Sequence, residues 1–224
     1  MRLGSTGRCA SFITQPNMFL PAENILSDFM EESAARHRHL CPRQVLGIRM
    51  GLYGLRQLGL VDRDFQPRYD NRLKHLLTVV ETDGCGADGV AVATDCYVGK
   101  RTLRVLDFGK MAATLVDTRS GTAVRVVPHP ESRQLAQVHA PEARSRWHAY
   151  LEAYRFIPDE LLLSIREVSL TQSIAEILSR PTARANCDVC GEEIINQREI
   201  EQGGRILCRS CAGETYYREL KATR

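Results

Sequence analysis

The stretch His37–Pro42, HRHLCP, places two histidines and a cysteine within five residues. His39 and Cys41 are two residues apart, so on an extended segment both side chains project to one side. An imidazole and a thiolate together suit Zn(II), Fe(II), Ni(II) or Cu, and three such ligands leave a coordination position for water or substrate. His37 is either a further ligand or an acid–base group beside the metal. The alternative is a partly exposed histidine pair and a packed cysteine.

Two cysteines are expected at the starts of helices. Cys41 immediately precedes Pro42, and proline is favoured at the first helical position, so Cys41 is the predicted N-cap. Unpaired amide groups and the helix dipole favour a thiolate there. Cys85 follows a buried strand and begins another helix, so the two sulfurs can meet and form, with His39, an open metal site. Alternatively, an enzyme uses metal-activated water or the Cys41 thiolate, with His37 as general base; these two residues are the catalytic candidates.

Two further residues are candidates for the same site. Asp88 lies one helical turn after Cys85, where its carboxylate either orients His37 or His39 or caps the helix. Cys96 either completes a set of three cysteines or packs as a small apolar side chain. The spacing alone leaves both alternatives open.

Four cysteines near the carboxyl end form two Cys-x-x-Cys pairs, Cys187 with Cys190 and Cys208 with Cys211, separated by seventeen residues. Four thiolates at this spacing converge on Zn(II) and leave no open position, which predicts a structural site. A unit of under about 40 residues buries too little apolar surface to fold alone, so zinc supplies most of its folding free energy. Residues 187–224 carry six basic and seven acidic side chains, which favours protein contact over nucleic-acid binding.

The remaining chain mixes helical and strand patterns, which predicts an α+β domain with a mixed or antiparallel sheet and packed helices. Three glycines in one helix, Gly47, Gly51 and Gly54, indicate close packing against another helix or another chain. The expected domains are a flexible leader at 1–20, the α+β domain at 21–178, a linker at 179–186 and the zinc finger at 187–224. Helices are expected at 22–37, 43–59, 87–96, 141–154 and 172–178, and strands at 76–80, 102–108, 111–117, 122–129 and 164–168.

The composition suits a soluble globular protein: 224 residues, 43% hydrophobic and 25% charged. No apolar run approaches the ~20 residues that cross a bilayer, and the amino terminus lacks the apolar core of a secretory signal. Thirty basic residues against 27 acidic ones, with no basic arm, indicate no general affinity for nucleic acid. The sequence therefore predicts a cytoplasmic protein that does not contact membranes.

The segments HRHLCPRQVLGIRMG, ETDGCGADGVAVATDCYVGKRTL and LDFGKMA, in this order, resemble the FmdE family of formylmethanofuran dehydrogenase proteins over roughly residues 20–170. The cysteine pairs, with Gly191 and Glu192 after the first, resemble the DksA/TraR zinc finger, which also implies a helix after the second pair. The positions that match the FmdE pattern are His37, His39, Cys41, Pro42, Cys85, Asp88, Cys96, Gly99, Lys100, Gly109 and Lys110.

The sequence departs from the family pattern beside the site. Arg38 and Arg43 stand where glycines are expected, and they either select an anionic ligand or lie on the solvated surface. Lys100 and Lys110 each follow a glycine, where the backbone can approach a ligand closely, and the same two interpretations apply to them.

The resemblance implies a cytoplasmic metal-binding protein that is accessory to a molybdenum- or tungsten-dependent formylmethanofuran- or formate-type oxidoreductase. It implies Zn(II) in the finger, a second divalent metal (Zn, Fe or Ni) in the first domain, and a homodimer. The alternatives are a stand-alone metal- or thiolate-dependent enzyme and a regulator that binds a protein partner through the finger. Whether the chain is an enzyme stays open, because a shared fold does not carry its chemistry along.

Overall fold

The computed structural model describes residues 19–179, 182–218 and 220. The expected flexible leader, residues 1–20, therefore lies outside the described residues except for its last two positions. The chain forms two compact units, one ending at Ser169 and the other beginning at Leu170. No helix in the described part of the chain has the length and apolar character that spanning a membrane requires.

The first unit is built on a five-stranded mixed sheet in the order β2-β1-β3-β4-β5. Strands β1 and β2 are parallel, with Thr78 opposite Leu103, and every other neighbouring pair is antiparallel. This confirms the α+β class with a mixed sheet. The strands are β1 (Leu76–Val80), β2 (Leu103–Val105), β3 (Ala113–Asp117), β4 (Ala123–Pro128) and β5 (Leu163–Val168).

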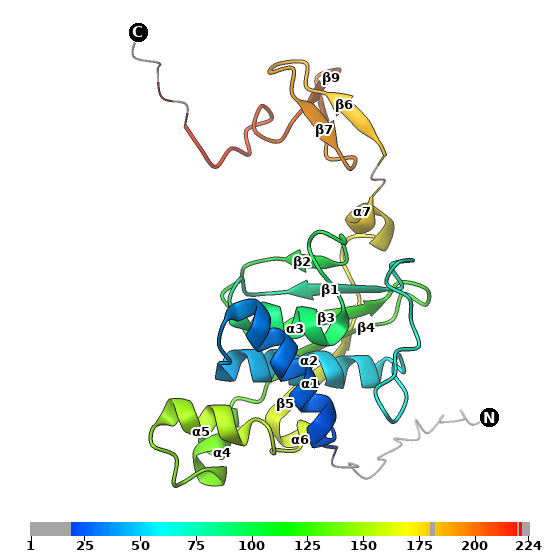
Figure 1. Ribbon diagram of the computed structural model, residues 1–224. Coiled ribbons are helices and arrows are strands. Elements are labelled where there is room, and N and C mark those ends of the chain that lie inside the picture. The colour runs from blue at the N-terminus through cyan, green and yellow to red at the C-terminus, as the bar shows by residue number, and fades with distance from the viewer. Residues whose placement is uncertain (1–18, 180–181, 219, 221–224) are drawn as a thin grey trace, which may run out of the picture. The chain divides into compact units, whose positions relative to one another are not determined.

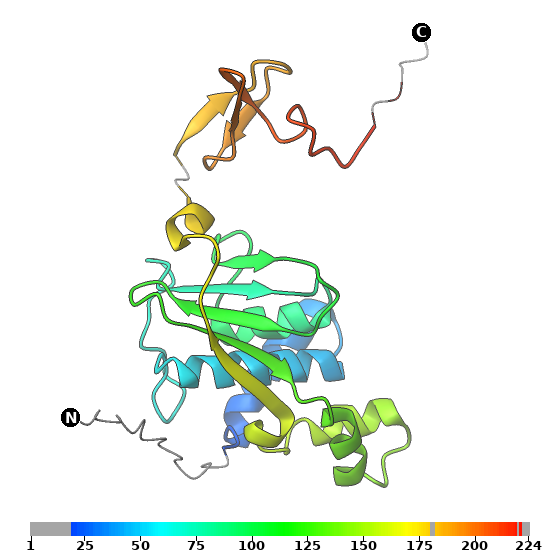
Figure 2. The same ribbon diagram turned by 180° about the vertical axis from the view of Figure 1, so that it is seen from behind.

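Three helices pack on one face of this sheet, and Figure 2 shows the opposite face, where the strands lie in front of them (Figures 1 and 2). They are α1 (Glu23–His37), α2 (Pro42–Gln57) and α3 (Cys85–Thr94). Three more helices, α4 (Ser132–His139), α5 (Arg146–Ala153) and α6 (Asp159–Leu162), lie between β4 and β5 in the chain. The sequence predicted a helix at 141–154 but missed α4, whose residues were not expected to form any element.

Glycines bring α2 and α3 into backbone contact. A Cβ on Gly47 would lie 2.3 Å from the Gly86 carbonyl oxygen, and one on Gly89 would lie 2.2 Å from the Gln44 carbonyl oxygen. Gly51 faces Ala93 in the same way. The close packing predicted from these glycines is therefore a helix–helix contact within the chain, and it does not by itself require a second copy.

We expect Gly89→Ala to lower the free energy of unfolding by about 1–3 kcal/mol, because the added methyl group meets backbone atoms that cannot move aside without separating the helices. The matched control is Gly99→Ala, since nothing lies within 4 Å of a Cβ at Gly99. Urea unfolding measures both changes. Equal effects of the two substitutions would contradict this account of the α2–α3 contact.

The second unit contains α7 (Ile174–Leu178) and two small antiparallel hairpins. The first hairpin pairs β6 (Arg184–Asn186) with β7 (Glu193–Ile195), and the second pairs β8 (Ile200–Gln202) with β9 (Arg205–Leu207). Residues 184–186, expected as linker, thus form a strand of the cysteine-containing module. The helix expected after the second cysteine pair is absent from the described residues, which form turns at 209–213.

Candidate metal centre and the cleft beside it

Cys41 is the N-cap of α2, as predicted. Its backbone is extended (φ −125°, ψ 160°), and its amide donates to Gln44 Oε1 at 2.8 Å. Gln44 Nε2 in turn donates to the carbonyl oxygen and the hydroxyl of Ser33, at 3.1 and 2.9 Å. Gln44 therefore fixes the start of α2 against α1 and holds Cys41 in a buried position.

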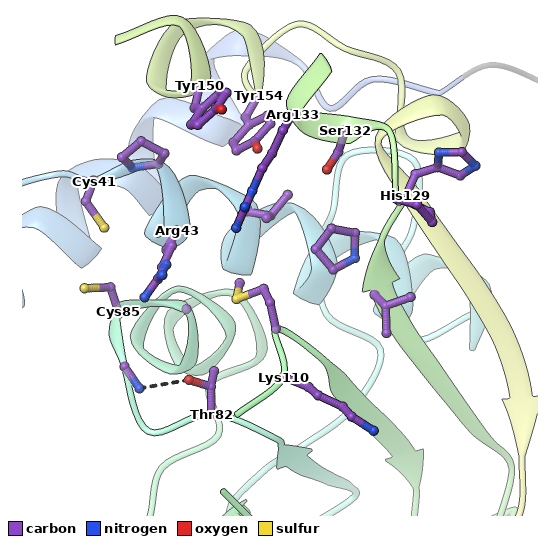
Figure 3. Close-up of a pocket in the computed structure, with 18 of the residues that line it drawn as sticks. Cys41, Arg43, Thr82, Cys85, Lys110, His129, Ser132, Arg133, Tyr150 and Tyr154 are labelled. Carbon is purple, nitrogen blue, oxygen red and sulfur yellow. Dashed lines mark hydrogen bonds between the residues drawn. The ribbon is translucent and has the colours of Figure 1, made fainter. Parts of the chain in front are cut away.

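Cys85 is the first residue of α3, also as predicted. The close approach of α2 and α3 brings the Cys41 and Cys85 side chains into contact, and Figure 3 shows both sulfurs on the same side of the cleft. Burial, followed by the neighbouring Cys41 sulfur, raises the pKa of the Cys85 thiol. The sequence had predicted the opposite direction from the helix start alone. Two adjacent thiols are stable as thiolates when a cation lies between them.

His37, rather than His39, contacts Cys85. Its Nε2 lies 3.3 Å from Cys85 Sγ, and its Nδ1 lies 3.0 Å from Asp88 Oδ2. A carboxylate on one ring nitrogen leaves the other free to act as a metal ligand, so Asp88 takes the orienting position considered for it. His39 is exposed and its ring centroid is 4.7 Å from that of His37. The extended approach expected for His39 is interrupted because α1 continues through His37 and ends at Arg38 with a left-handed φ of 63°.

These side chains fit an open metal site: two thiols and one imidazole, with the imidazole held by a carboxylate. They do not form a closed cage. In the described part of the chain, the C-terminal four-cysteine cluster is the one group of three or more His, Cys, Asp or Glu residues whose ligand atoms all lie within 4.8 Å of one another. The arrangement around Cys85 consists of contacting pairs.

Cys96 lies at the other end of α3 from Cys85. The helix has ten residues, so at about 1.5 Å per residue the two cysteines are roughly 15 Å apart along its axis. Cys96 is fully buried, and its sulfur accepts from Thr78 Oγ1 and Asn71 Nδ2, each at 3.3 Å. The alternative of a third cysteine ligand is therefore wrong, and Cys96 is a packing residue of the core.

A cleft of about 900 Å³ opens beside Cys41 and Cys85 (Figure 3). Of the four basic residues singled out in the sequence, Arg43 and Lys110 line it. Arg38 and Lys100 do not; Lys100 instead pairs with Asp95 at 2.6 Å. The sequence missed the residues of the opposite wall, which come from β4 and from the segment 129–154 that contains α4 and α5; they are Arg125, Val127, Pro128, His129, Pro130, Ser132, Arg133, Trp147, Tyr150 and Tyr154.

In the second unit, the sulfurs of Cys187, Cys190, Cys208 and Cys211 form the single cluster described above. Gly191 has a φ of 77°, and its amide donates to the Cys187 carbonyl oxygen at 2.9 Å, so the predicted tight turn after the first pair is present. The amide of Cys208 donates to Cys187 Sγ at 3.3 Å. Backbone amides lower the pKa of Cys187 to about 6, while neighbouring sulfurs raise that of Cys211 to about 12. Four sulfurs in one place, one already favoured as thiolate, form a closed tetrahedral site for zinc.

Comparisons with known proteins agree with both units. The family described as "FmdE, Molybdenum formylmethanofuran dehydrogenase operon" matches residues 36–170, and the "Prokaryotic dksA/traR C4-type zinc finger" matches residues 180–217. A crystal structure of an FmdE-like protein of tungsten formylmethanofuran dehydrogenase, from Syntrophus aciditrophicus, has a similar fold, with a TM-score of 0.58 and 22% identity. The match covers 86% of this chain and 94% of that one.

A curated relative, named a probable S-adenosyl-L-methionine-binding protein, from Archaeoglobus fulgidus, is 30% identical over 197 residues. This match covers 80% of this chain and 51% of the relative, so the chain spans about half the length of that protein.

Proposed function

Because the chain belongs to the FmdE family and carries a C4 zinc finger, we propose that it is an accessory metal-binding protein whose first domain holds a second divalent metal at Cys41, Cys85 and His37. We propose that it serves a molybdenum- or tungsten-dependent formylmethanofuran- or formate-type oxidoreductase. The family description, which refers to the operon of such an enzyme, supports this role. The finger is the structural part of the protein.

The observation that carries the metal site is the chain of contacts from Asp88 through His37 to Cys85. The Asp88 carboxylate is 3.0 Å from His37 Nδ1, and His37 Nε2 is 3.3 Å from Cys85 Sγ. The carboxylate holds the ring with Nε2 directed at the sulfur, as a ligand shared with a metal requires. A bound metal would supply a Lewis acid at the cleft, while Gln44 holds Cys41, and Asp88 holds His37, in position.

Metal content measured by elemental analysis tests this proposal. We expect about two ions per wild-type chain and about one in Cys41→Ser/Cys85→Ser, because that variant loses both thiolates of the first site and keeps the finger. Cys187→Ser/Cys190→Ser should likewise hold about one. The matched control is Cys96→Ser, which changes a buried thiol outside both sites and should keep two.

Full metal content in Cys41→Ser/Cys85→Ser would contradict the proposed site. If the wild type instead holds a single ion that only the finger substitution removes, the result favours a second candidate function. In that case Cys85, His37 and Asp88 form a thiol, imidazole and carboxylate in hydrogen-bonding sequence, which is the arrangement of a cysteine nucleophile with its base.

The ligand named for the Archaeoglobus relative is not carried over to this chain. S-adenosyl-L-methionine has a sulfonium cation, whereas the described residues that line the cleft include Arg43, Lys110 and Arg133 and no carboxylate. A basic cleft disfavours a cation, since like charges repel across a site of low dielectric.

A further inference from the structure

The cleft beside the candidate metal centre has positive charge that the proposed metal site does not use. Among the described residues, Arg43, Lys110 and Arg133 form no ion pair. Arg125 also lines the cleft, but Glu81 accepts from its Nε and Nη2 at 2.6 and 2.7 Å, so its charge is neutralised. Three unpaired cations therefore face a cleft whose described lining contains no aspartate or glutamate.

Two of these cations stand where helix electrostatics disfavours them. Arg43 is the second residue of α2 and Arg133 is the second residue of α4. The amino-terminal end of a helix carries partial positive charge and favours anions, so an arginine in the first turn is unfavourable there. Both side chains point into the cleft (Figure 3). Residues that break a local rule without a compensating contact in the free protein are typical of binding sites.

The wall opposite the metal centre is aromatic. Trp147, at the start of α5, lines the cleft with 44% of its surface exposed. Tyr150 and Tyr154 stack on each other beside it, with ring centroids 5.8 Å apart and ring planes 9° apart. An exposed tryptophan beside stacked tyrosines offers a surface on which a planar ring packs with favourable geometry.

We propose that this cleft binds a small organic anion that carries an aromatic ring. Its carboxylate or phosphate group pairs with Arg43 and Arg133, and its ring packs against Trp147 and Tyr150. The volume of about 900 Å³ accommodates a ligand of this size. The proposal goes beyond the metal site, because it rests on side chains that are not metal ligands.

Titration calorimetry with matched pairs of probes tests it, each pair being an aromatic anion and its neutral counterpart: adenosine monophosphate with adenosine, flavin mononucleotide with riboflavin, and benzoate with benzamide. We expect at least one anion to bind at least ten times more tightly than its neutral partner. Arg43→Gln/Arg133→Gln should weaken that binding by about 10- to 100-fold, since a hydrogen bond to a charged group contributes about 1.5–3 kcal/mol. The phosphate and carboxylate probes distinguish the two anionic groups.

The matched control is Arg63→Gln/Arg68→Gln, which removes the same charge from exposed positions that do not line the cleft and should leave affinity unchanged. Equal binding of anions and neutral partners, equal loss in the control variant, or no binding of any anion at millimolar concentration would overturn the proposal. The Cys41→Ser/Cys85→Ser variant separates it from the proposed function. Retained binding there supports the arginine site even if no metal binds at the cysteines, and lost binding would assign the anion to the metal instead.

Discussion

Cys208→Ser should unfold the zinc finger and leave the α+β domain folded. The buried apolar cluster of the finger consists of only Cys187, Ile194 and Leu207, and one of these is itself a metal ligand. Two hairpins with three-residue strands cannot offset the conformational entropy of ordering the chain with so small a core. Zinc binding contributes on the order of 10 kcal/mol or more in such modules, so its loss exceeds the stability of the unit.

Amide spectra of the full chain measure this effect. In Cys208→Ser, signals from residues 184–217 should collapse to unfolded shifts, while those of the sheet residues 76–80 and 113–117 stay dispersed. The α+β domain has its own extensive core and belongs to a separate compact unit, which is why it should not respond. Cys96→Ser serves as the control. Dispersed signals from the finger in Cys208→Ser would show that its fold does not depend on the metal.

Asp159→Leu should destabilise the first domain by about 3–5 kcal/mol. Arg49 and Asp159 are both fully buried, and Arg49 Nε and Nη2 donate to Asp159 Oδ1 at 2.9 and 2.6 Å. Arg49 also donates to the carbonyl oxygens of Tyr154 and Ile157, at 2.7 and 2.6 Å. The guanidinium therefore ties the middle of α2 to the end of α5 and to α6. Removing the carboxylate leaves a buried, unpaired charge at this junction.

A double-mutant cycle in urea unfolding checks this explanation. Arg49→Met/Asp159→Leu should be less destabilised than Asp159→Leu alone, because the second change removes the unpaired charge. Additive effects of the two substitutions would show that the pair does not interact as the geometry indicates.

Local signals predicted much of the fold. The run of apolar residues between His75 and the Asp83-Gly84 turn predicted β1 with its observed bounds, and Pro42 identified Cys41 as an N-cap, because both features depend on neighbouring residues. α4 was missed because its eight residues lie among prolines and polar residues, with only Ala136 and the partly exposed Leu135 and Val138 to indicate a buried face. The short finger strands were missed for a related reason, since pairing across a hairpin defines them more than composition does.

The candidate site was predicted in part for the same physical reason. The sequence brought Cys41 and Cys85 together because each begins a helix. It assigned the imidazole to His39 because the point at which α1 ends depends on the left-handed conformation of Arg38, which composition does not reveal. The Cys96 alternative required the distance along α3, and the cleft required contacts between segments about 90 residues apart in the chain, such as Arg43 and Arg133. Such contacts are fixed by tertiary packing.

The most direct test of the proposed metal centre is cobalt absorption in a full-length chain whose four finger cysteines are replaced by serine. At saturating Co(II), thiolate-to-cobalt charge-transfer absorption should appear with the intensity of two sulfur ligands, because Cys41 and Cys85 then provide the thiolates. It should fall by about half in Cys41→Ser and disappear in Cys41→Ser/Cys85→Ser, and His37→Gln should change the visible ligand-field bands. Absorption that is absent from the start, or that persists when both cysteines are replaced, would contradict a metal site at the meeting point of α2 and α3.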